Sequence, residues 1–426
     1  MRKLLFLLFV FSIGSAQQQE IVSWIDGHAV VIEDANPDSE LTLFSQNAPD
    51  GFKNARIFGF GEASHHGKEF FDLKAKFFKY LVLYHGVKVF IMEESYQAER
   101  GVNAFITGGA GDAQSVLENF GQGIWRCKEV SALLQWMRDY NAGKPVEKQI
   151  RFYGMENQFG QDIAARLEQY LKVNQMEVDG KLLAIVAECS ATALGTKVPK
   201  GWSKDKLLAI DQVSAIIRED VVKRKASGNP EYKDMQRGLR YLSQFIAYLE
   251  TPYGGVRDQN MYENVVDILE KETSGEKAFI WAHNEHIIND DYSRGAKSTG
   301  SYLKDKYRDA YYSVGFDFGK GELKGYLFEN GKVKAATYRT MDAPYENTFA
   351  ATMMAATPDI YFLDMAGAKN APGNFFGKKN RQLFLGGPGF DPEKLWFLSR
   401  RYTKAYDGLI FVDTISPMTY WPKPKL

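Results

Sequence analysis

Two stretches of the chain hold clustered histidine and carboxylate side chains, the groups that proteins most often use as general acids and bases. The first stretch reads GEASHHGKEFF and contains Glu62, His65 and His66. The second reads AHNEH and contains His283 and His286. Together they hold four of the six histidines of the chain. Because a carboxylate can orient a histidine ring that takes up a proton, this pattern predicts proton-transfer chemistry.

Each stretch follows or closes a short apolar run that is typical of a buried strand. These runs are residues 57–60 and 278–282, and a third run at residues 87–92 ends in Glu93 and Glu94. The carboxyl ends of strands in an open α/β sheet share one crevice, so we expect these side chains to converge there. A helix cap with surface histidines would explain GEASHH by itself, but not the repetition of the pattern at three strands.

Strands and helices alternate around these groups. After Gly67 the apolar residues have the spacing of one buried helix face, and this predicted helix ends at His85. A strand at residues 150–153 leads to Glu156, and a final strand is predicted near residues 406–414. The sequence therefore predicts an α/β fold in which a mostly parallel sheet is flanked by helices.

The alternation stops in the middle of the chain, where apolar residues follow helical spacing only. We expect residues 17–160 to form the first part of an α/β catalytic core and residues 256–426 the second part. Residues 161–255 between them are predicted to be a helical insertion that forms a cleft wall or lid. A C-terminal hairpin is expected about Asn330-Gly331.

The N-terminus has the pattern of a secretory signal peptide. Arg2 and Lys3 precede an apolar run from Leu4 to Ile13, and small residues follow up to Ala16. We expect cleavage after Ala16 and export to the periplasm or the extracellular space. No other segment approaches 18 consecutive apolar residues, so we expect no membrane span in the mature chain.

The charge balance argues against a polyanionic partner. Lys plus Arg and Asp plus Glu both number 53, so no net field favours nucleic acid or an anionic membrane. A small molecule is the expected partner. Only Cys127 and Cys189 are present, which excludes a cysteine-rich metal site, and we expect both thiols to be free and partly buried.

Six motifs resemble, in order and spacing, the erythromycin esterase family of macrolide-lactone hydrolases: GEASHHGKEFF, the Glu93 that closes VKVFIME, IWRCKEVSALLQWMRDYN, RFYGMENQ, RDQNMYENV and AHNEHI. The resemblance extends from about residue 21 to residue 418, with a weakly matching middle. It implies hydrolysis of a small-molecule ester such as a macrolide, without a cofactor or an obligatory metal. It also implies that the active site contains Glu62, His65, Glu93, His283 and His286.

Water activated by histidine is the expected nucleophile for such a hydrolysis. The chain contains no GxSxG elbow, and neither cysteine lies beside a candidate base. We expect His65 to accept the water proton while Glu62 orients its ring and stabilises the imidazolium. Glu93 is expected to bind the same water or a second proton. Either His283 or His286 is expected to donate to the oxyanion or to the leaving alkoxide.

Three further residues are candidates for substrate binding. Lys74 stands where the resembled family can have an arginine, and a lysine there keeps the charge but loses the bidentate geometry. Arg257 is a second candidate cation, although a structural ion pair would explain it equally well. His66 is the third. Glu156 stands where the family usually has aspartate, and it is expected either to line the cleft or to support the residues that do.

Other functions remain open for the same residues. The His and Glu cluster offers nitrogen and oxygen ligands that suit zinc or manganese, so a metal-dependent hydrolase is an alternative. An esterase acting on another natural product or on a polysaccharide acyl ester is a second. A non-enzymatic protein that binds a ligand or metal through these histidines is a third.

Overall fold

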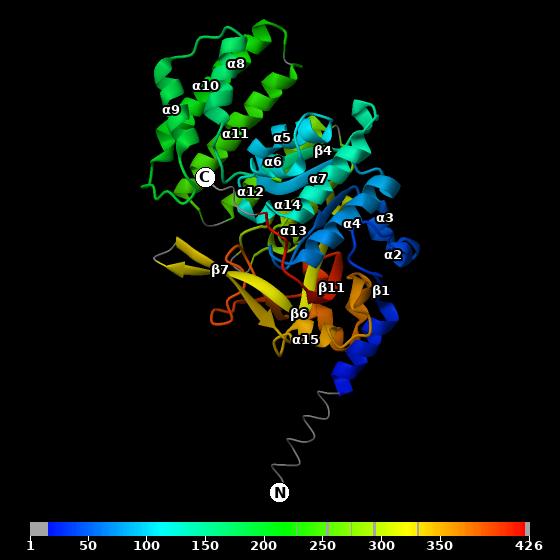
Figure 1. The fold of residues 1–426 in the computed structure, drawn as a ribbon. Coiled ribbons are helices and arrows are strands. Elements are labelled where there is room, and N and C mark those ends of the chain that lie inside the picture. The colour runs from blue at the N-terminus through cyan, green and yellow to red at the C-terminus, as the bar shows by residue number, and fades with distance from the viewer. Residues whose placement is uncertain are drawn as a thin grey trace.

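The computed structural model describes residues 16–226, 228–252, 255–273, 275–292, 295–329 and 332–421. The expected signal peptide lies outside these residues except for Ala16, and so does the turn at Asn330-Gly331. The predicted α/β fold, with a mostly parallel sheet flanked by helices, is confirmed (Figure 1).

One large sheet forms the centre of the molecule. Within the described residues it has the strand order β1-β8-β11-β6-β2-β5-β3-β4, and β7 pairs with β6. The six strands from β11 to β4 run parallel, whereas β8, β1 and β7 are antiparallel to their neighbours. The strand bounds are β1 Val30–Val31, β2 Ile57–Phe60, β3 Val89–Ser95, β4 Arg151–Glu156, β5 Ala278–Trp281, β6 Tyr311–Glu329, β7 Lys332–Met341, β8 Ile360–Asp364 and β11 Gly408–Ile415.

Helices cover both faces of this sheet. Alternate residues of one strand point to opposite faces, so Phe58 and Phe60 belong to one apolar core and Ile57 to the other. The first core packs against α4 (Lys68–His85) and α7 (Lys128–Asn141), and the second against α12 (Val256–Asp267) and α14 (Thr299–Tyr307). Because both faces are buried, the central strands are almost wholly apolar.

Shorter helices complete this part of the molecule. Residues 16–28 are helical. The other helices here are α2 Thr42–Asn47, α3 Asp50–Asn54, α5 Tyr96–Ile106, α6 Ala113–Leu117, α13 Asn284–Ile287, α15 Phe349–Met353 and α16 Tyr402–Ala405.

Four helices follow β4 and form a separate layer, drawn in green at the top of Figure 1. They are α8 (Ile163–Val173), α9 (Gly180–Ala191), α10 (Ser203–Lys223) and α11 (Pro230–Glu250). Their apolar residues form a core of their own, which includes Leu167, Val213 and Phe245. This layer is therefore stabilised mainly by contacts among its own helices.

The strand that begins at Tyr311 is longer than the sequence predicts. We expected one strand over residues 311–316 and a separate hairpin, but β6 continues without a break to Glu329 and pairs with β7 along its second half. Gly321 has a φ of 144°, and a Cβ there would lie 1.9 Å from the carbonyl oxygen of Ile415. This glycine lets one strand leave the parallel sheet and enter the hairpin.

Two smaller expectations can be compared with the structure. Cys127 and Cys189 are free, as predicted, but both residues are fully rather than partly buried. Over the residues that the structure describes, no helix is long and apolar enough to cross a membrane.

A two-stranded ribbon lies outside the main sheet. It consists of β9 (Asn380–Leu383) and β10 (Phe397–Arg400), which pair antiparallel. Just beyond these strands, the backbone N–H of Phe384 donates to the carbonyl of Trp396 at 2.9 Å, so the pairing continues past the strand ends. The apolar pattern of the sequence did not predict this ribbon.

Candidate active site

The carboxyl ends of three neighbouring strands bring the predicted residues together. Strand β5 lies between β2 and β3, and the three run parallel. Directly after β2, Gly61 lies against Asn284, where a Cβ would approach the Asn284 side-chain oxygen to 2.2 Å. Asn284 in turn exchanges hydrogen bonds with the backbone of Phe316. Glycine at position 61 therefore allows the two histidine-containing loops to pack directly on each other.

His65 and Glu62 form a buried pair at this edge. Nδ1 of His65 lies 2.6 Å from Oε1 of Glu62, so Nδ1 carries the proton that it donates to the carboxylate. No hydrogen bond to Nε2 of His65 is formed within the described ranges, and this nitrogen is available as a proton acceptor. The His65 ring also packs edge-on against Trp125, with the ring centroids 5.4 Å apart. The ring is thus held in one orientation from two sides.

Lys74 fixes the position of the Glu62 carboxylate. Its ammonium group forms an ion pair with the second oxygen of Glu62, and it lies 3.9 Å from the ring centroid of Trp281. Burial lowers the pKa of Lys74 to about 8, although the charge of Glu62 opposes this shift. Lys74 is fully buried and does not line the cavity. We expected it to bind substrate, but the structure places it where it orients Glu62.

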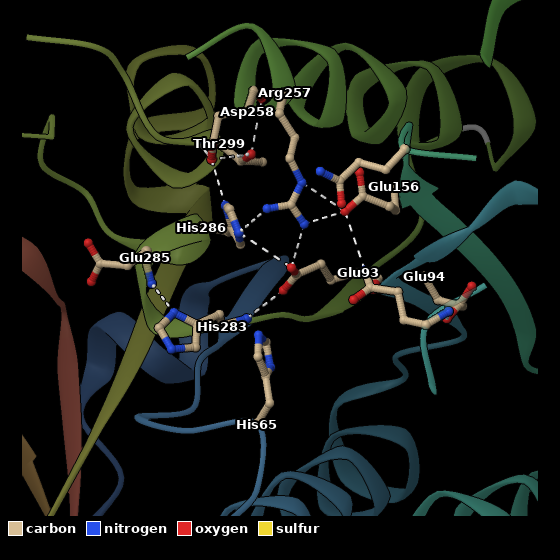
Figure 2. Close-up of polar contacts among 12 residues, drawn as sticks. His65, Glu93, Glu94, Glu156, Arg257, Asp258, His283, Glu285, His286 and Thr299 are labelled. Atoms are coloured by element: carbon tan, nitrogen blue, oxygen red, sulfur yellow. Dashed lines mark hydrogen bonds and ion pairs between the residues drawn. The ribbon is translucent and has the colours of Figure 1, made fainter. Parts of the chain in front are cut away.

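Arg257 lies at the centre of a cluster of acidic side chains (Figure 2). Its guanidinium donates to Glu93 Oε1 at 2.6 Å and to Glu156 Oε2 at 2.9 Å through Nε. Its Nη1 lies 2.8 Å from Nε2 of His286. Arg257 thus joins the strand ends of β3 and β4 to the loop after β5, and it also lines the cavity.

Glu93 is held in its ionised form. Burial by itself would raise its pKa, but the charges of His286 and Arg257 hold the pKa of Glu93 well below its usual value. Its Oε2 also accepts the backbone N–H of His283 at 2.9 Å. Glu156 is completely buried behind Arg257 and does not line the cavity. Of its two expected placements, the structure shows the supporting one.

His286 lies between two carboxylates. Its Nδ1 is 2.9 Å from Asp258 Oδ1 and its Nε2 is 3.4 Å from Glu93 Oε1. Burial lowers the pKa of His286, but Asp258 and Glu93 outweigh that effect and raise it to about 10, with Arg257 acting in the opposite direction. The two carboxylates thus favour the protonated ring, whereas the Arg257 N–H that faces Nε2 at 2.8 Å favours the neutral ring, so His286 lies between groups that favour gain and loss of a proton.

His283 has the opposite protonation state. Burial, together with the charge of His65, lowers the pKa of His283 well below its usual value, so the ring is neutral. Its Nδ1 accepts the backbone N–H of Glu285 at 3.2 Å, and Nε2 lies 3.2 Å from the carbonyl of Leu385. Both nitrogens are thus engaged by the backbone. His283 packs against His65 at 4.9 Å between ring centroids and is better placed to position that ring than to donate a proton.

A cavity of about 520 Å³ opens over these residues. Of the predicted site residues, His65, Glu93, Arg257, His283 and His286 line it. The rest of its wall is formed by Gln122, Gln158, Glu285, Tyr292, Phe384, Gly386, Gly387, Trp396 and Leu398.

His66 is not part of this cavity wall, although we expected it to bind substrate. Its Nδ1 lies 2.6 Å from the hydroxyl of Tyr420, and Nε2 lies 3.4 Å from the carbonyl of Gly387. Burial, followed by the charges of His65 and Lys324, lowers the pKa of His66 to about 3. His66 therefore anchors the loop at Gly387 as a neutral, buried residue.

Two carboxylates that shape the site had no role assigned to them from the sequence, although Glu94 was named there as the end of a strand. Asp258 follows Arg257 directly in the RD pair, and its contact with His286 depends on how α12 packs against the loop after β5. Glu94 follows Glu93, and it accepts the backbone N–H groups of Gly121 and Gln122 at 2.7 and 3.1 Å. It thereby fixes the loop that places Gln122 at the cavity. Each of these carboxylates directly follows a residue that the sequence had already singled out, and this adjacency was the signal that could have found them.

The arrangement of the side chains around Arg257 can be compared with the site that a metal-dependent hydrolase would need. Among the described residues, no group of three or more His, Cys, Asp and Glu side chains is arranged to hold a metal ion. The guanidinium of Arg257 lies between Glu93, Glu156 and His286, and it makes the contacts that a shared metal would have to make. The cation at the centre of this cluster is thus supplied by the chain itself.

Comparisons with known proteins agree with this architecture. A sequence model of the erythromycin esterase family matches residues 82–415. A Bacillus cereus protein has a similar structure, with a TM-score of 0.81 and 22% identity over 95% of this chain and 99% of its own. A succinoglycan biosynthesis protein gives a TM-score of 0.78 and 21% identity over 95% and 99%. A mutant of the erythromycin esterase EreC in its open conformation gives 0.63 and 16% over 91% and 97%.

Proposed function

The chain belongs to the erythromycin esterase family, and from this premise we propose that it is an exported enzyme that opens the lactone ring of a macrolide such as erythromycin and so confers resistance. Family membership implies hydrolysis of an ester in a small molecule. The observation that supports the mechanism is the Glu62–His65 pair at a cavity that Glu93 and His286 also line.

In this mechanism His65 is the general base. Nε2 accepts a proton from a water molecule as the water oxygen attacks the ester carbonyl carbon. Glu62 Oε1 accepts a hydrogen bond from the Nδ1–H group, with 2.6 Å between nitrogen and oxygen, and its charge stabilises the imidazolium that forms. Lys74 keeps the other Glu62 oxygen engaged, so the carboxylate cannot turn away from His65. Positioned general-base catalysis of this kind contributes roughly 10²- to 10⁴-fold to the rate.

His286 is the general acid that completes the reaction. When the tetrahedral intermediate collapses, the bond between the carbonyl carbon and the ring oxygen breaks, and the alkoxide takes the Nε2 proton of His286. The contact of 2.8 Å with Arg257 is a hydrogen bond only when Nε2 has lost its proton. Arg257 therefore stabilises the neutral ring after donation, while Asp258 and Glu93 favour the return of a proton.

Positive charge near the reacting carbonyl supports the same assignment. Arg257 and protonated His286 both line the cavity, so each can stabilise the oxyanion of the tetrahedral intermediate. His283 holds the orientation of His65 by ring contact.

Export is proposed from the N-terminal pattern of two basic residues, an apolar run and small residues. Expression of the full chain in a bacterial host, followed by fractionation and mass measurement of the N-terminus, tests it. A mature protein that begins after Ala16 outside the cytoplasm is expected. Retention of the full chain in the cytoplasm would contradict export.

Incubation of the purified protein with erythromycin, followed by mass spectrometry, tests the substrate. The hydrated, ring-opened product is expected with the natural protein and not with His65→Ala. A panel of other esters is included because one structural relative is a succinoglycan biosynthesis protein. Turnover of a polysaccharide acyl ester but not of the macrolide would favour the alternative esterase over the proposed one.

A further inference from the structure

The cavity wall contains an aromatic surface that the proposed chemistry does not use. Trp396 and Phe384 extend from the ends of the β9–β10 ribbon, and both line the cavity. Their ring centroids are 6.4 Å apart. Phe384 also meets the His283 ring edge-on at 5.6 Å. An aromatic surface therefore runs from the mouth of the cavity to the histidine beside the proposed base.

Trp396 is unusually exposed for a tryptophan. Its relative exposure is 65%, and it belongs to the few large apolar side chains on the surface of the described residues. An indole face left in water at a cavity mouth is a feature of binding sites, because burial by a ligand recovers the apolar area. The backbone pairing of Phe384 with Trp396 fixes both residues on the ribbon.

Two glutamines provide polar groups in another part of the cavity wall. The amide nitrogen of Gln122 donates to the carbonyl of Glu93 at 3.1 Å, and that of Gln158 donates to the hydroxyl of Tyr248 at 2.8 Å. Both amides are thus fixed through nitrogen. Within the described ranges no hydrogen bond to either amide oxygen is formed. These oxygens can accept hydrogen bonds from a ligand.

We propose that Trp396, Phe384, Gln122 and Gln158 form a subsite for the non-reacting part of the substrate, and that this part is a hydroxylated ring. One apolar face of the ring stacks on Trp396 and Phe384. Its hydroxyl groups donate to the amide oxygens of Gln122 and Gln158. The inference rests on the proposed esterase function, since it places the reacting ester at His65.

The chemistry of the wall selects against a simple acyl chain. An aliphatic ester would cover the indole equally well, but it would leave the two amide oxygens desolvated and without donors. Sites that hydrogen-bond a hydroxyl discriminate strongly against analogues that lack it. The subsite therefore favours polyhydroxylated ring esters, whether a macrolide or an acylated sugar.

Calorimetric binding to the inactive His65→Ala protein tests the subsite without turnover. The probes are erythromycin, an acetylated methyl glucoside and p-nitrophenyl butyrate, which has no hydroxyl groups. Erythromycin and the glucoside are the ring probes, because each presents a hydroxylated ring. We expect at least one of them to bind, and more tightly than p-nitrophenyl butyrate. Adding Trp396→Ala should weaken ring binding about 10-fold or more, whereas Trp396→Phe should largely restore it. Gln158→Leu should weaken ring binding but not butyrate binding.

Tyr84→Ala is the matched control, because Tyr84 is 67% exposed at the opposite end of α4 and does not line the cavity. It should leave all affinities unchanged. If no ring probe binds, or if Trp396→Ala binds the rings as well as its parent does, the subsite is overturned. Hydrolysis of p-nitrophenyl butyrate by the natural protein reports separately on the esterase function, so the two failures are distinguishable.

Discussion

Asp258 holds His286 through a contact of 2.9 Å between Oδ1 and Nδ1, and the same carboxylate oxygen accepts both the backbone N–H and the hydroxyl of Thr299. These bonds stabilise the ionised form of Asp258, whose pKa lies below its usual value because the charge of His286 outweighs the effect of burial. A fixed negative charge next to Nδ1 makes His286 a stronger base than free histidine, so it stays protonated over a wide pH range.

Replacement of this carboxylate should shift the pH profile. In Asp258→Asn we expect the alkaline limb of kcat/KM, set near pH 10 by His286, to move toward the ordinary histidine value of 6.5. Protonated His286 is lost as the pH rises through its pKa, so the variant should lose activity at lower pH than its parent. At pH 8 a complete shift to 6.5 would leave about 3% of His286 protonated, so the loss there should be at most roughly 30-fold. Asp305→Asn, in a surface ion pair with Lys297, is the control. An unmoved limb would contradict the general-acid role.

His65→Ala and Glu62→Gln should both lower kcat by roughly 10²- to 10⁴-fold, because each removes part of the general base. The two variants should differ in thermal stability. Glu62→Gln leaves the ammonium of fully buried Lys74 without its counter-charge, so its thermal midpoint should fall well below that of His65→Ala. Adding Lys74→Met to Glu62→Gln should restore the midpoint but not the activity. Equal midpoints for all variants would show that the pair has no structural role.

Arg257→Lys keeps the charge but cannot bridge Glu93, Glu156 and His286 at once. We expect kcat/KM to fall by about 10²-fold while the protein stays folded. Arg257→Gln should be much less stable, since buried Glu156 loses its cationic partner and buried Glu93 keeps only His286. Adding Glu156→Gln to Arg257→Gln should recover part of that stability, which urea titration followed by circular dichroism can measure. Full activity in Arg257→Lys would contradict the central position of this residue.

Acid stability should depend on His66. Its pKa is about 3 in the folded protein and 6.5 for an ordinary histidine, so between these values the unfolded chain binds a proton that the folded protein does not. The free energy of unfolding should therefore fall as the pH drops from 6.5, by at most about 1.4 kcal/mol per pH unit from this group. In His66→Gln the slope of stability against pH in that window should be smaller. An unchanged slope would show that His66 is protonated in the folded state.

Turnover should survive removal of divalent metals. The guanidinium of Arg257 provides the positive charge among Glu93, Glu156 and His286, so dialysis against a chelator should leave kcat unchanged. Elemental analysis of the dialysed protein is the control that metal has been removed. Stoichiometric metal together with activity that a chelator abolishes would favour the metal-dependent alternative.

The strand ends around the site could be predicted because their signals are local. The apolar run of β2 has the bounds that the sequence predicts, and the three runs before Glu62, Glu93 and His283 are neighbouring strands. Two side chains singled out for substrate binding, those of Lys74 and His66, are instead buried. Residue type marks a group that can do chemistry, but which way it points depends on packing against distant segments, such as Tyr420 for His66.

Long-range pairing explains what the sequence did not reveal. The β9–β10 ribbon pairs residues on either side of a loop rich in glycine and proline, and its strands have no regular alternation of apolar and polar residues. The contact of Asp258 with His286 joins α12 to the short helix α13, across 28 residues of sequence. Neither relationship leaves a periodic signal in one sequence.

The position of β2, β5 and β3 inside the sheet, with paired neighbours on both sides, has a consequence for heat inactivation. Their amide protons should exchange with deuterium only when the entire molecule opens, because interior strands open at the global unfolding free energy. Since His65, Glu93 and His286 are attached to these slowly exchanging strands, fraying at the chain ends should not impair catalysis. Loss of activity on heating should coincide with the main calorimetric transition.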